Sequence, residues 1–485
     1  MTKELKRLSI LMLLMFIALF ASTSWIQVAQ SESLAENSRN TRALYDSYQV
    51  QRGSIIASGA AIASSVASDD VFSWQRVYQD AAMWAPVTGY INPALGSATG
   101  LEQSMNQELS GTAGSQFLTR MERVITGQNP QGSNVVLSLD SVVQKAAYDA
   151  LGDLQGAVVA IEPSTGRILA MVTSPSYDTN TLAVHDASVV NDAYDMLNTN
   201  PTHPLYNRAI SGDLNPPGST FKLVVASAAL ASGNYTPAST FPNVASYTLP
   251  GTSTSISNAG GGACGPGDTV TLADALRLSC NIPMAELAVA LGDDAIREEA
   301  EKYGFNSSFT MPLTSTPSTY PRALSDDKTA LTGFGQGDVR ATPLQMAMVS
   351  AAIADGGTVM NPRMVDQVIA PDLSVQQTFD DTEFGQALDP ELAQQMATMM
   401  VANVNDGAAS GARIDGVDVG GKTGTAENGN TKPYSLWFTG FAPADNPRVA
   451  VAVVVEDGGG QGQSGSGNTI AAPIAKKVME AVLGK

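Results

Sequence analysis

Residues 215–230 read NPPGSTFKLVVASAAL, a stretch that changes abruptly from helix-breaking to helix-forming residues. Two prolines and a glycine prevent a helix before Ser219, so this serine is predicted to lie at a helix N-terminus. Residues three positions apart share a helix face, which places the amine of Lys222 within reach of the Ser219 hydroxyl. A lysine can take the serine's proton if burial or a nearby cation lowers its pKa. Ser219 is therefore a candidate nucleophile, although Ser-x-x-Lys alone more often marks a helix cap and a solvated lysine.

The two histidines of the chain, His185 and His203, lie in loop-like sequence and are interpreted as solvated surface residues. A Ser-His-Asp triad needs a histidine, so lysine is the favoured base if this is a serine enzyme. The histidines and the two cysteines, Cys264 and Cys280, could together be counted toward a zinc site. They lack the close paired spacing of structural zinc ligands, so no metal site is predicted.

A second motif, Ser279-Cys280-Asn281, follows an apolar helical stretch at 272–276. Its hydroxyl can pass a proton to a leaving nitrogen, and its amide can hold the backbone of a substrate. Serine and asparagine are ordinary turn residues, so this motif alone indicates little.

A third motif reads Lys-Thr-Gly-Thr and ends a predicted strand. Gly424 is expected to let the backbone of a ligand approach closely. Lys422 supplies a positive charge, which near Lys222 would lower the pKa of that lysine. Thr423 and Thr425 are candidates for binding a carboxylate.

The three motifs occur in the order found in penicillin-binding proteins and class A β-lactamases. On these residues the chain resembles the penicilloyl-serine transferases, and among them the class B penicillin-binding proteins, which are monofunctional peptidoglycan D,D-transpeptidases. Further segments that resemble this family are 156–171, 335–337, 342–347 and 437–443. Residues 37–39, 52–55 and 100–102 resemble the N-terminal pedestal of class B members, most nearly of the actinobacterial penicillin-binding protein A type, although 56–59 lacks the usual Asp-Arg-Asn.

The resemblance implies an α+β fold with an antiparallel five-stranded sheet flanked by helices and an all-helical subdomain. The apolar pattern agrees, since it predicts strands at 135–139, 157–161, 168–172, 417–425, 435–441 and 448–456, and helices at 140–151 and 470–483. The expected division is a cytoplasmic tail (1–7), a transmembrane anchor (8–28), a small α+β pedestal (29–134) and a transpeptidase domain (135–485).

The start of the chain predicts export of everything that follows. Basic residues precede an apolar run from Leu8 to Val28, which is long enough to cross a bilayer as a helix. The alternative is a cleaved signal peptide, because the residues at 21–24 are small. We expect a single-pass protein of the cell membrane with its catalytic domain outside the cytoplasm. The two cysteines would there form a Cys264–Cys280 disulfide.

The resemblance also implies the chemistry of acylation. Ser219 attacks the carbonyl between the two terminal D-alanines of a stem peptide, and Lys222 takes its proton. The oxyanion lies between the backbone N–H groups of Ser219 and Thr425. β-Lactams, which mimic this peptide end, acylate the same serine.

The other motif residues would serve the leaving group and the substrate. Ser279 relays a proton to the departing nitrogen, and Asn281 holds the peptide backbone and orders the lysine base. The substrate carboxylate meets Lys422, Thr423 and Thr425, with Gly424 between them. An amine of a second stem peptide then forms the cross-link, and no metal or organic cofactor is implied.

Three other functions compete with a transpeptidase. A D,D-carboxypeptidase uses the same acyl-enzyme with water as acceptor. A β-lactamase needs an activating glutamate, but no Glu-x-x-Leu-Asn stretch follows Asn281. A catalytically idle scaffold for cell-wall or division proteins has no need for all the motif residues.

Among partners, a glycan polymerase and division or elongation proteins are expected candidates. Nucleic acid is excluded because 46 acidic residues against 27 basic ones give a net charge of −19.

Overall fold

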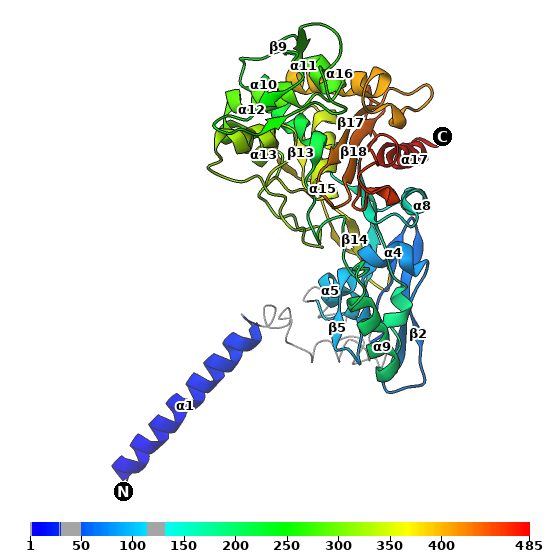
Figure 1. Ribbon diagram of the computed structural model, residues 1–485. Helices are drawn as coiled ribbons and strands as arrows, with labels where there is room; N and C mark the ends of the chain where they lie inside the picture. The colour runs from blue at the N-terminus through cyan, green and yellow to red at the C-terminus, as the bar shows by residue number, and fades with distance from the viewer. Residues whose placement is uncertain (1, 29, 31–49, 114–130) are drawn as a thin grey trace.

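The computed structural model of the chain describes residues 2–28, 30, 50–113 and 131–485. Figure 1 shows an N-terminal helix and two lobes, of which the upper one holds the C-terminus. The predicted pedestal segment 37–39 lies outside the described residues.

The upper lobe is built on a sheet of five antiparallel strands in the order β17-β18-β19-β7-β8. This confirms the predicted sheet, which joins strands from both ends of the domain. The strands are β7 (Gly156–Ile161), β8 (Ile168–Ser174), β17 (Gly420–Ala426), β18 (Ser435–Ala442) and β19 (Val449–Val455). All side chains of β18 and β19 are buried because helices cover both faces of the sheet.

One face of this sheet packs against α8 (Ser141–Leu151) and α17 (Ala471–Leu483). Asp140 begins α8 as predicted, because its carboxylate accepts hydrogen bonds from the N–H groups of Val142 and Val143. The other face packs against α15 (Pro343–Ala354), a helix buried along nearly its whole length.

A mainly helical subdomain lies beside β17 (Figure 1). Its helices are α10 (Lys222–Ala231), α11 (Leu272–Arg277), α12 (Ile282–Leu291), α13 (Asp293–Lys302), α14 (Asp326–Thr332) and α16 (Pro390–Asp406). It also carries two short antiparallel strand pairs, namely β9 (Thr240–Pro242) with β12 (Thr269–Thr271) and β10 (Tyr247–Thr248) with β11 (Ser255–Ile256). A further pair joins β13 (Thr358–Met360) to β16 (Glu383–Gln386).

The lower lobe contains a six-stranded sheet in the order β15-β14-β6-β1-β2-β3. Its strands are β1 (Ile55–Ala57), β2 (Ala60–Ala67), β3 (Trp74–Tyr78), β6 (Asn134–Leu137), β14 (Val365–Ile369) and β15 (Val375–Thr378). β6 pairs in parallel with β1 and antiparallel with β14, so late residues complete the N-terminal sheet. The predicted domain boundary after residue 134 stays a prediction, and this sheet crosses it.

Short elements complete the pedestal region. They are α4 (Ala81–Thr88), β4 (Ile91–Asn92), β5 (Ser97–Ala98), α5 (Gly100–Ser104) and α6 (Asn106–Ser110), and nearby lie η2 (Thr179–Leu182) and α9 (Ala187–Asn198).

Glu102 lies buried between two arginines, at 2.9 Å from Arg52 Nη2 and 2.5 Å from Arg76 Nε. Burial alone would raise the pKa of Glu102, but the two guanidinium groups hold it below its usual value.

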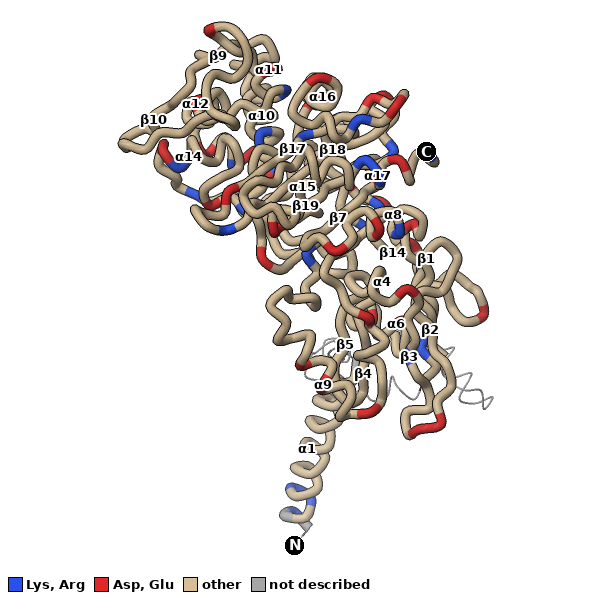
Figure 2. Tube along the Cα trace, turned by 45° about the vertical axis from the view of Figure 1, so that its right-hand side comes forward, with Lys and Arg blue, Asp and Glu red and all other residues tan. Residues whose placement is uncertain are grey.

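The first helix, α1 (Thr2–Val28), has an apolar stretch at Leu5–Gln27 that is long enough to span a membrane. Its apolar side chains are exposed, as expected for a helix that does not belong to a protein core. Figure 2 shows basic residues at its N-terminal end. This arrangement matches the predicted anchor.

Candidate active site

Ser219 lies in η3 (Gly218–Phe221), a single 3-10 turn that leads directly into α10. The turn is fixed from two sides: the Trp437 indole donates to Pro216 O at 2.9 Å, and Gly218 N donates to Gly335 O at 3.0 Å. Gly335 has a φ of +72°, and a Cβ there would lie 2.0 Å from Gly218 O. A glycine is therefore required at 335 to hold the backbone before Ser219.

Lys222, one turn later, is completely buried. Its Nζ donates to Ser279 O at 2.7 Å and to Asn281 Oδ1 at 2.8 Å. Burial, together with the charge of Lys422, holds the pKa of Lys222 well below its ordinary value. The lowered pKa favours the neutral amine, which is the form that can accept a proton.

In the described part of the chain no hydrogen bond joins Lys222 Nζ to Ser219 Oγ. The amine is turned instead toward the carbonyl and amide oxygens of the Ser-x-Asn turn. Hydrogen bonds of this kind are often long in the absence of substrate, so the geometry keeps Lys222 as the candidate base.

Ser279 lies between two lysine amines. Its Oγ is 2.8 Å from Lys422 Nζ and 3.4 Å from Lys222 Nζ. Its φ of +62° is in the left-handed region. The cause is the end of α11, where Ser279 N donates to Leu276 O and Cys280 N to Ala275 O. These two bonds form a Schellman motif, which places Ser279 at a position that usually holds glycine.

Asn281 comes two residues after Ser279 and stands directly before the first residue of α12. Its Oδ1 accepts from Lys222, while its Nδ2 donates to Ser257 O at 3.2 Å. The two ends of the amide therefore have different partners, which fixes its orientation.

β17 is the edge strand of the sheet and brings the third motif beside η3. Lys422 is completely buried, and burial lowers its pKa to about 7. Its Nζ also donates to Thr423 O at 2.9 Å. Gly424, two residues after Lys422, was predicted to let the backbone of a ligand approach. The structure shows a different reason for a glycine at this position. A Cβ on Gly424 would lie 2.8 Å from Pro217 O, so the approaching backbone is that of the serine loop.

The two threonines of this motif have protein partners in the structure. Thr423 Oγ1 donates to Ala408 O at 3.0 Å, so its hydroxyl must turn to donate to a carboxylate. Thr425 is exposed, and its Oγ1 accepts from Gly467 N at 3.2 Å. Their predicted role in binding substrate stays a prediction.

Comparison with known proteins decides the family. Residues 156–480 match the family described as penicillin binding protein transpeptidase domain, and residues 52–135 match the penicillin binding protein A dimerisation domain. The chain belongs to the penicillin-binding protein transpeptidase family. It is 40% identical to peptidoglycan D,D-transpeptidase PbpA of Mycolicibacterium smegmatis over 100% of this chain and 99% of the relative.

Solved structures agree with this assignment. The penicillin G acyl-enzyme complex of penicillin-binding protein A from M. tuberculosis has a TM-score of 0.85 and 39% identity, covering 90% of this chain and 100% of that one. The imipenem acyl-enzyme complex of the same protein has a TM-score of 0.86, 40% identity and the same coverage. The fold predicted from the three motifs is therefore confirmed, and this is a class B penicillin-binding protein.

In this penicillin-binding protein a disulfide joins Cys264 to Cys280, with 5.7 Å between the Cα atoms. The predicted bridge is present, and it ties the Ser-x-Asn turn to the glycine-rich loop before β12. The histidines lie elsewhere: His185 pairs with Asp70, and His203 stacks on Tyr206. Within the ranges that the structure describes, no group of three or more His, Cys, Asp or Glu could hold a metal ion.

Sequence reasoning missed two groups that support the serine loop. The Trp437 indole, noted only as part of a family segment, bonds Pro216 O. Asn215 accepts from Ser435 Oγ at 2.8 Å and donates to Glu456 Oε1 at 3.0 Å. Glu456 in turn pairs with the buried Arg208 at 2.9 Å. These partners are distant in sequence, so no local pattern could have indicated them.

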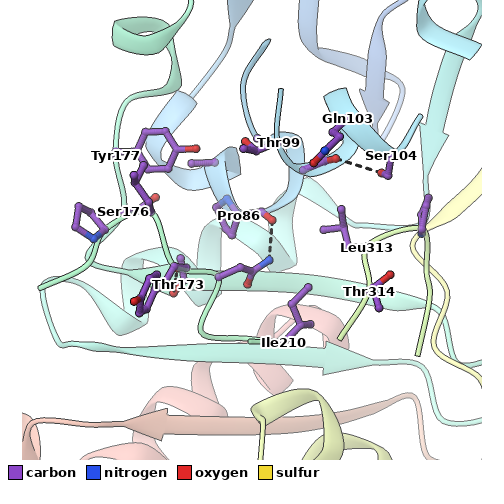
Figure 3. Close-up of a pocket in the computed structure, with 18 residues that line it drawn as sticks. Pro86, Thr99, Gln103, Ser104, Thr173, Ser176, Tyr177, Ile210, Leu313 and Thr314 are labelled. Carbon is purple, nitrogen blue, oxygen red and sulfur yellow. Dashed lines mark hydrogen bonds between the residues drawn. The ribbon is translucent and has the colours of Figure 1, made fainter. Parts of the chain in front are cut away.

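A cavity of about 380 Å³ lies where the two lobes meet. Figure 3 shows Pro86, Thr99 and Gln103 of the pedestal region facing Thr173 and Tyr177. None of the motif residues lines this cavity, so it is separate from the candidate active site.

Proposed function

We propose that this protein is a D,D-transpeptidase that cross-links peptidoglycan stem peptides through an acyl-enzyme on Ser219 and is blocked there by β-lactams. The observation that carries the proposal is the buried amine of Lys222, one turn after Ser219 and hydrogen-bonded to both polar residues of the Ser-x-Asn turn. Its relatives are named peptidoglycan D,D-transpeptidases, and solved structures similar to it are β-lactam acyl-enzymes.

In the proposed reaction, Ser219 Oγ attacks the carbonyl carbon of the penultimate D-alanine while its proton passes to Lys222. Backbone N–H groups of Ser219 and Thr425 stabilise the oxyanion. The C–N bond then breaks, and Ser279 relays a proton to the departing D-alanine nitrogen. The position of the Ser279 hydroxyl beside both lysine amines supports this relay. An amine of a second stem peptide finally takes the acyl group.

The terminal carboxylate of the substrate is assigned to Lys422, Thr423 and Thr425. Because the pKa of Lys422 is about 7, a nearby carboxylate would favour its charged form. The site would thus gain a cation when the anionic substrate binds, and Asn281 would hold the peptide backbone.

The apolar helix α1 supports the further proposal of a single-pass membrane protein with residues 135–485 as the catalytic domain outside the cytoplasm. Residues 29–134 would be the non-catalytic pedestal. Neither matched domain is a glycosyltransferase, so glycan polymerisation is assigned to a separate partner.

The first prediction is a penicilloyl adduct on Ser219. Purified protein treated with penicillin G is digested and the adduct is located by mass spectrometry. Ser219→Ala should keep its fold and lose all labelling. Ser227→Ala is the matched control, because Ser227 lies on the next helix with its hydroxyl bonded to Tyr303. An adduct on another serine would refute the assignment.

The acceptor is tested separately with a stem pentapeptide and an amine acceptor. A cross-linked product indicates a transpeptidase. Release of D-alanine without cross-linking indicates the carboxypeptidase alternative, and no turnover with an intact adduct site indicates a scaffold.

A further inference from the structure

Asn258 follows β11 and lies against the start of α12, where its side chain contacts Asn281, the residue after Cys280. It is buried, with 4% of its surface exposed. Its Oδ1 accepts two hydrogen bonds, from Asn281 N at 2.9 Å and from Ile282 N at 3.1 Å. Its Nδ2 donates two, to Gly262 O at 3.0 Å and to Val244 O at 3.3 Å. Every hydrogen-bonding position of this amide is used.

These bonds hold the backbone at the start of α12. An asparagine before a helix normally caps it by accepting from the N–H of the second or third helical residue. Asn281 makes no such bond, because its Oδ1 faces Lys222. Its own N–H and that of Ile282, the first residue of α12, are satisfied from outside the helix by Asn258.

The neighbouring residue holds the side chain of Asn281 as well, since Ser257 O accepts from Asn281 Nδ2 at 3.2 Å. Residues 257 and 258 therefore bond the backbone and the amide of Asn281 together. With its Nδ2 bound on this side, Asn281 presents its Oδ1 to Lys222 Nζ at 2.8 Å.

We propose that Asn258 is a positioning residue for acylation: it holds the N–H groups of Asn281 and Ile282, and so fixes the backbone from which the Asn281 amide orients the Lys222 amine. This inference rests on the proposed function, because it gives that amine the role of base. It assigns Asn258 no contact with substrate.

The chemistry of the four bonds requires an asparagine. An aspartate could accept from both N–H groups, but its second oxygen would face the carbonyls of Gly262 and Val244. A serine could accept at the helix end but could not reach both carbonyls. Loss of the amide would leave these two N–H groups unpaired and let the backbone of Asn281 shift, which would move its amide away from Lys222.

The test compares Asn258→Ala with Asn92→Ala. Asn92 is a matched control because it is also buried, accepts from Ala94 N and Leu95 N, and donates to Leu182 O and Val184 O. Both variants lose four hydrogen bonds of the same types. The rate of acylation by penicillin G and the melting temperature are measured for each. We expect acylation to fall about tenfold or more in Asn258→Ala and to stay at the wild-type value in Asn92→Ala.

A double-variant cycle tests whether Asn258 acts through Asn281. Asn281→Ala should slow acylation, and adding Asn258→Ala to it should slow acylation no further. Full additivity, or an unchanged rate in folded Asn258→Ala, would overturn the inference. If the alanine variant does not fold, Asn258→Ser replaces it, with a smaller expected slowing because a serine can still accept from an N–H at the helix end. A wild-type protein that penicillin G does not acylate would instead refute the proposed function itself.

Discussion

At the scale of single residues, the site depends on groups held in states they would not adopt in water. Two lysines are buried without a carboxylate partner among the described residues, and a serine adopts a left-handed backbone. Each state costs stability and is maintained by its neighbours. Stability and activity should therefore separate in variants of these residues.

Ser279 offers the clearest separation. Its left-handed φ suits glycine and strains any residue with a Cβ. We expect Ser279→Gly to be more stable than Ser279→Ala by about 1 kcal/mol. Both variants lack the hydroxyl that bonds Lys422, so both should lose most acylation by penicillin G. Denaturant unfolding and acylation kinetics are the measurements, and equal stabilities of the two variants would contradict the backbone argument.

Lys422 gives a pH dependence of stability. Its pKa is about 7 in the folded protein and 10.5 ordinarily, so between these values the unfolded chain holds a proton that the folded one has released. This lysine should therefore make the free energy of unfolding rise as pH increases from about 7 to 10.5. Above that range its contribution should stay at the higher value. Lys422→Met should remove this contribution, whereas Lys477→Met, at an exposed position of α17, should keep it. Denaturant unfolding at pH 7, 8.5 and 10 in all three proteins tests this, and parallel curves would refute it.

The motif residues were found from sequence because their types and order are diagnostic of one chemistry. Their backbone conformations and hydrogen-bond partners could not be found in this way. Nothing in the sequence indicates that Ser279 occupies a glycine position, since that follows from how α11 ends. Asn258 belongs to no motif, and its role appears only when the chain folds it onto the start of α12.

At the scale of elements, the sequence predicted best the strands and helices with continuous apolar runs. β18 and β19 were found because both faces are buried. β17 begins at Gly420, three residues later than predicted, because Ile414 and Val417 pair in a turn before it. The short pairs β9–β12 and β10–β11 were missed, since two- and three-residue strands leave no periodic signal.

The loop between β11 and β12 is an element whose effect on the site can be measured. The disulfide closes a separation of 16 residues, which contributes at most about 3 kcal/mol to the free energy of unfolding. We expect Cys264→Ser to slow penicillin acylation about tenfold under conditions where the variant stays folded, because Cys280 lies between Ser279 and Asn281. Reduction of the wild-type protein should reproduce the effect, and reduction of the variant should add nothing. Acylation that is insensitive to both changes would contradict this link.

At the scale of the whole molecule, residues from both sides of position 134 share the sheet of the lower lobe. β6 bonds β1 on one side and β14 on the other, so this sheet is completed only by residues that lie far apart in the sequence. We expect residues 50–485 to unfold in one calorimetric transition, with equal calorimetric and van't Hoff enthalpies. Val368→Pro should lower the melting temperature of that single transition, because Val368 pairs with Val135 in the shared sheet. Two separate transitions in the wild-type protein would show that the lobes fold independently.

The shared sheet also imposes an order of events on secretion. A chain that is exported behind its N-terminal anchor delivers Val135 long before its partner Val368, and Val158 long before Val453. Both sheets therefore wait with open strand edges while the rest of the chain is translocated, and such edges readily pair with other chains. We expect the emerging protein to need a holding chaperone on the outer side of the membrane until β14 and then β19 arrive.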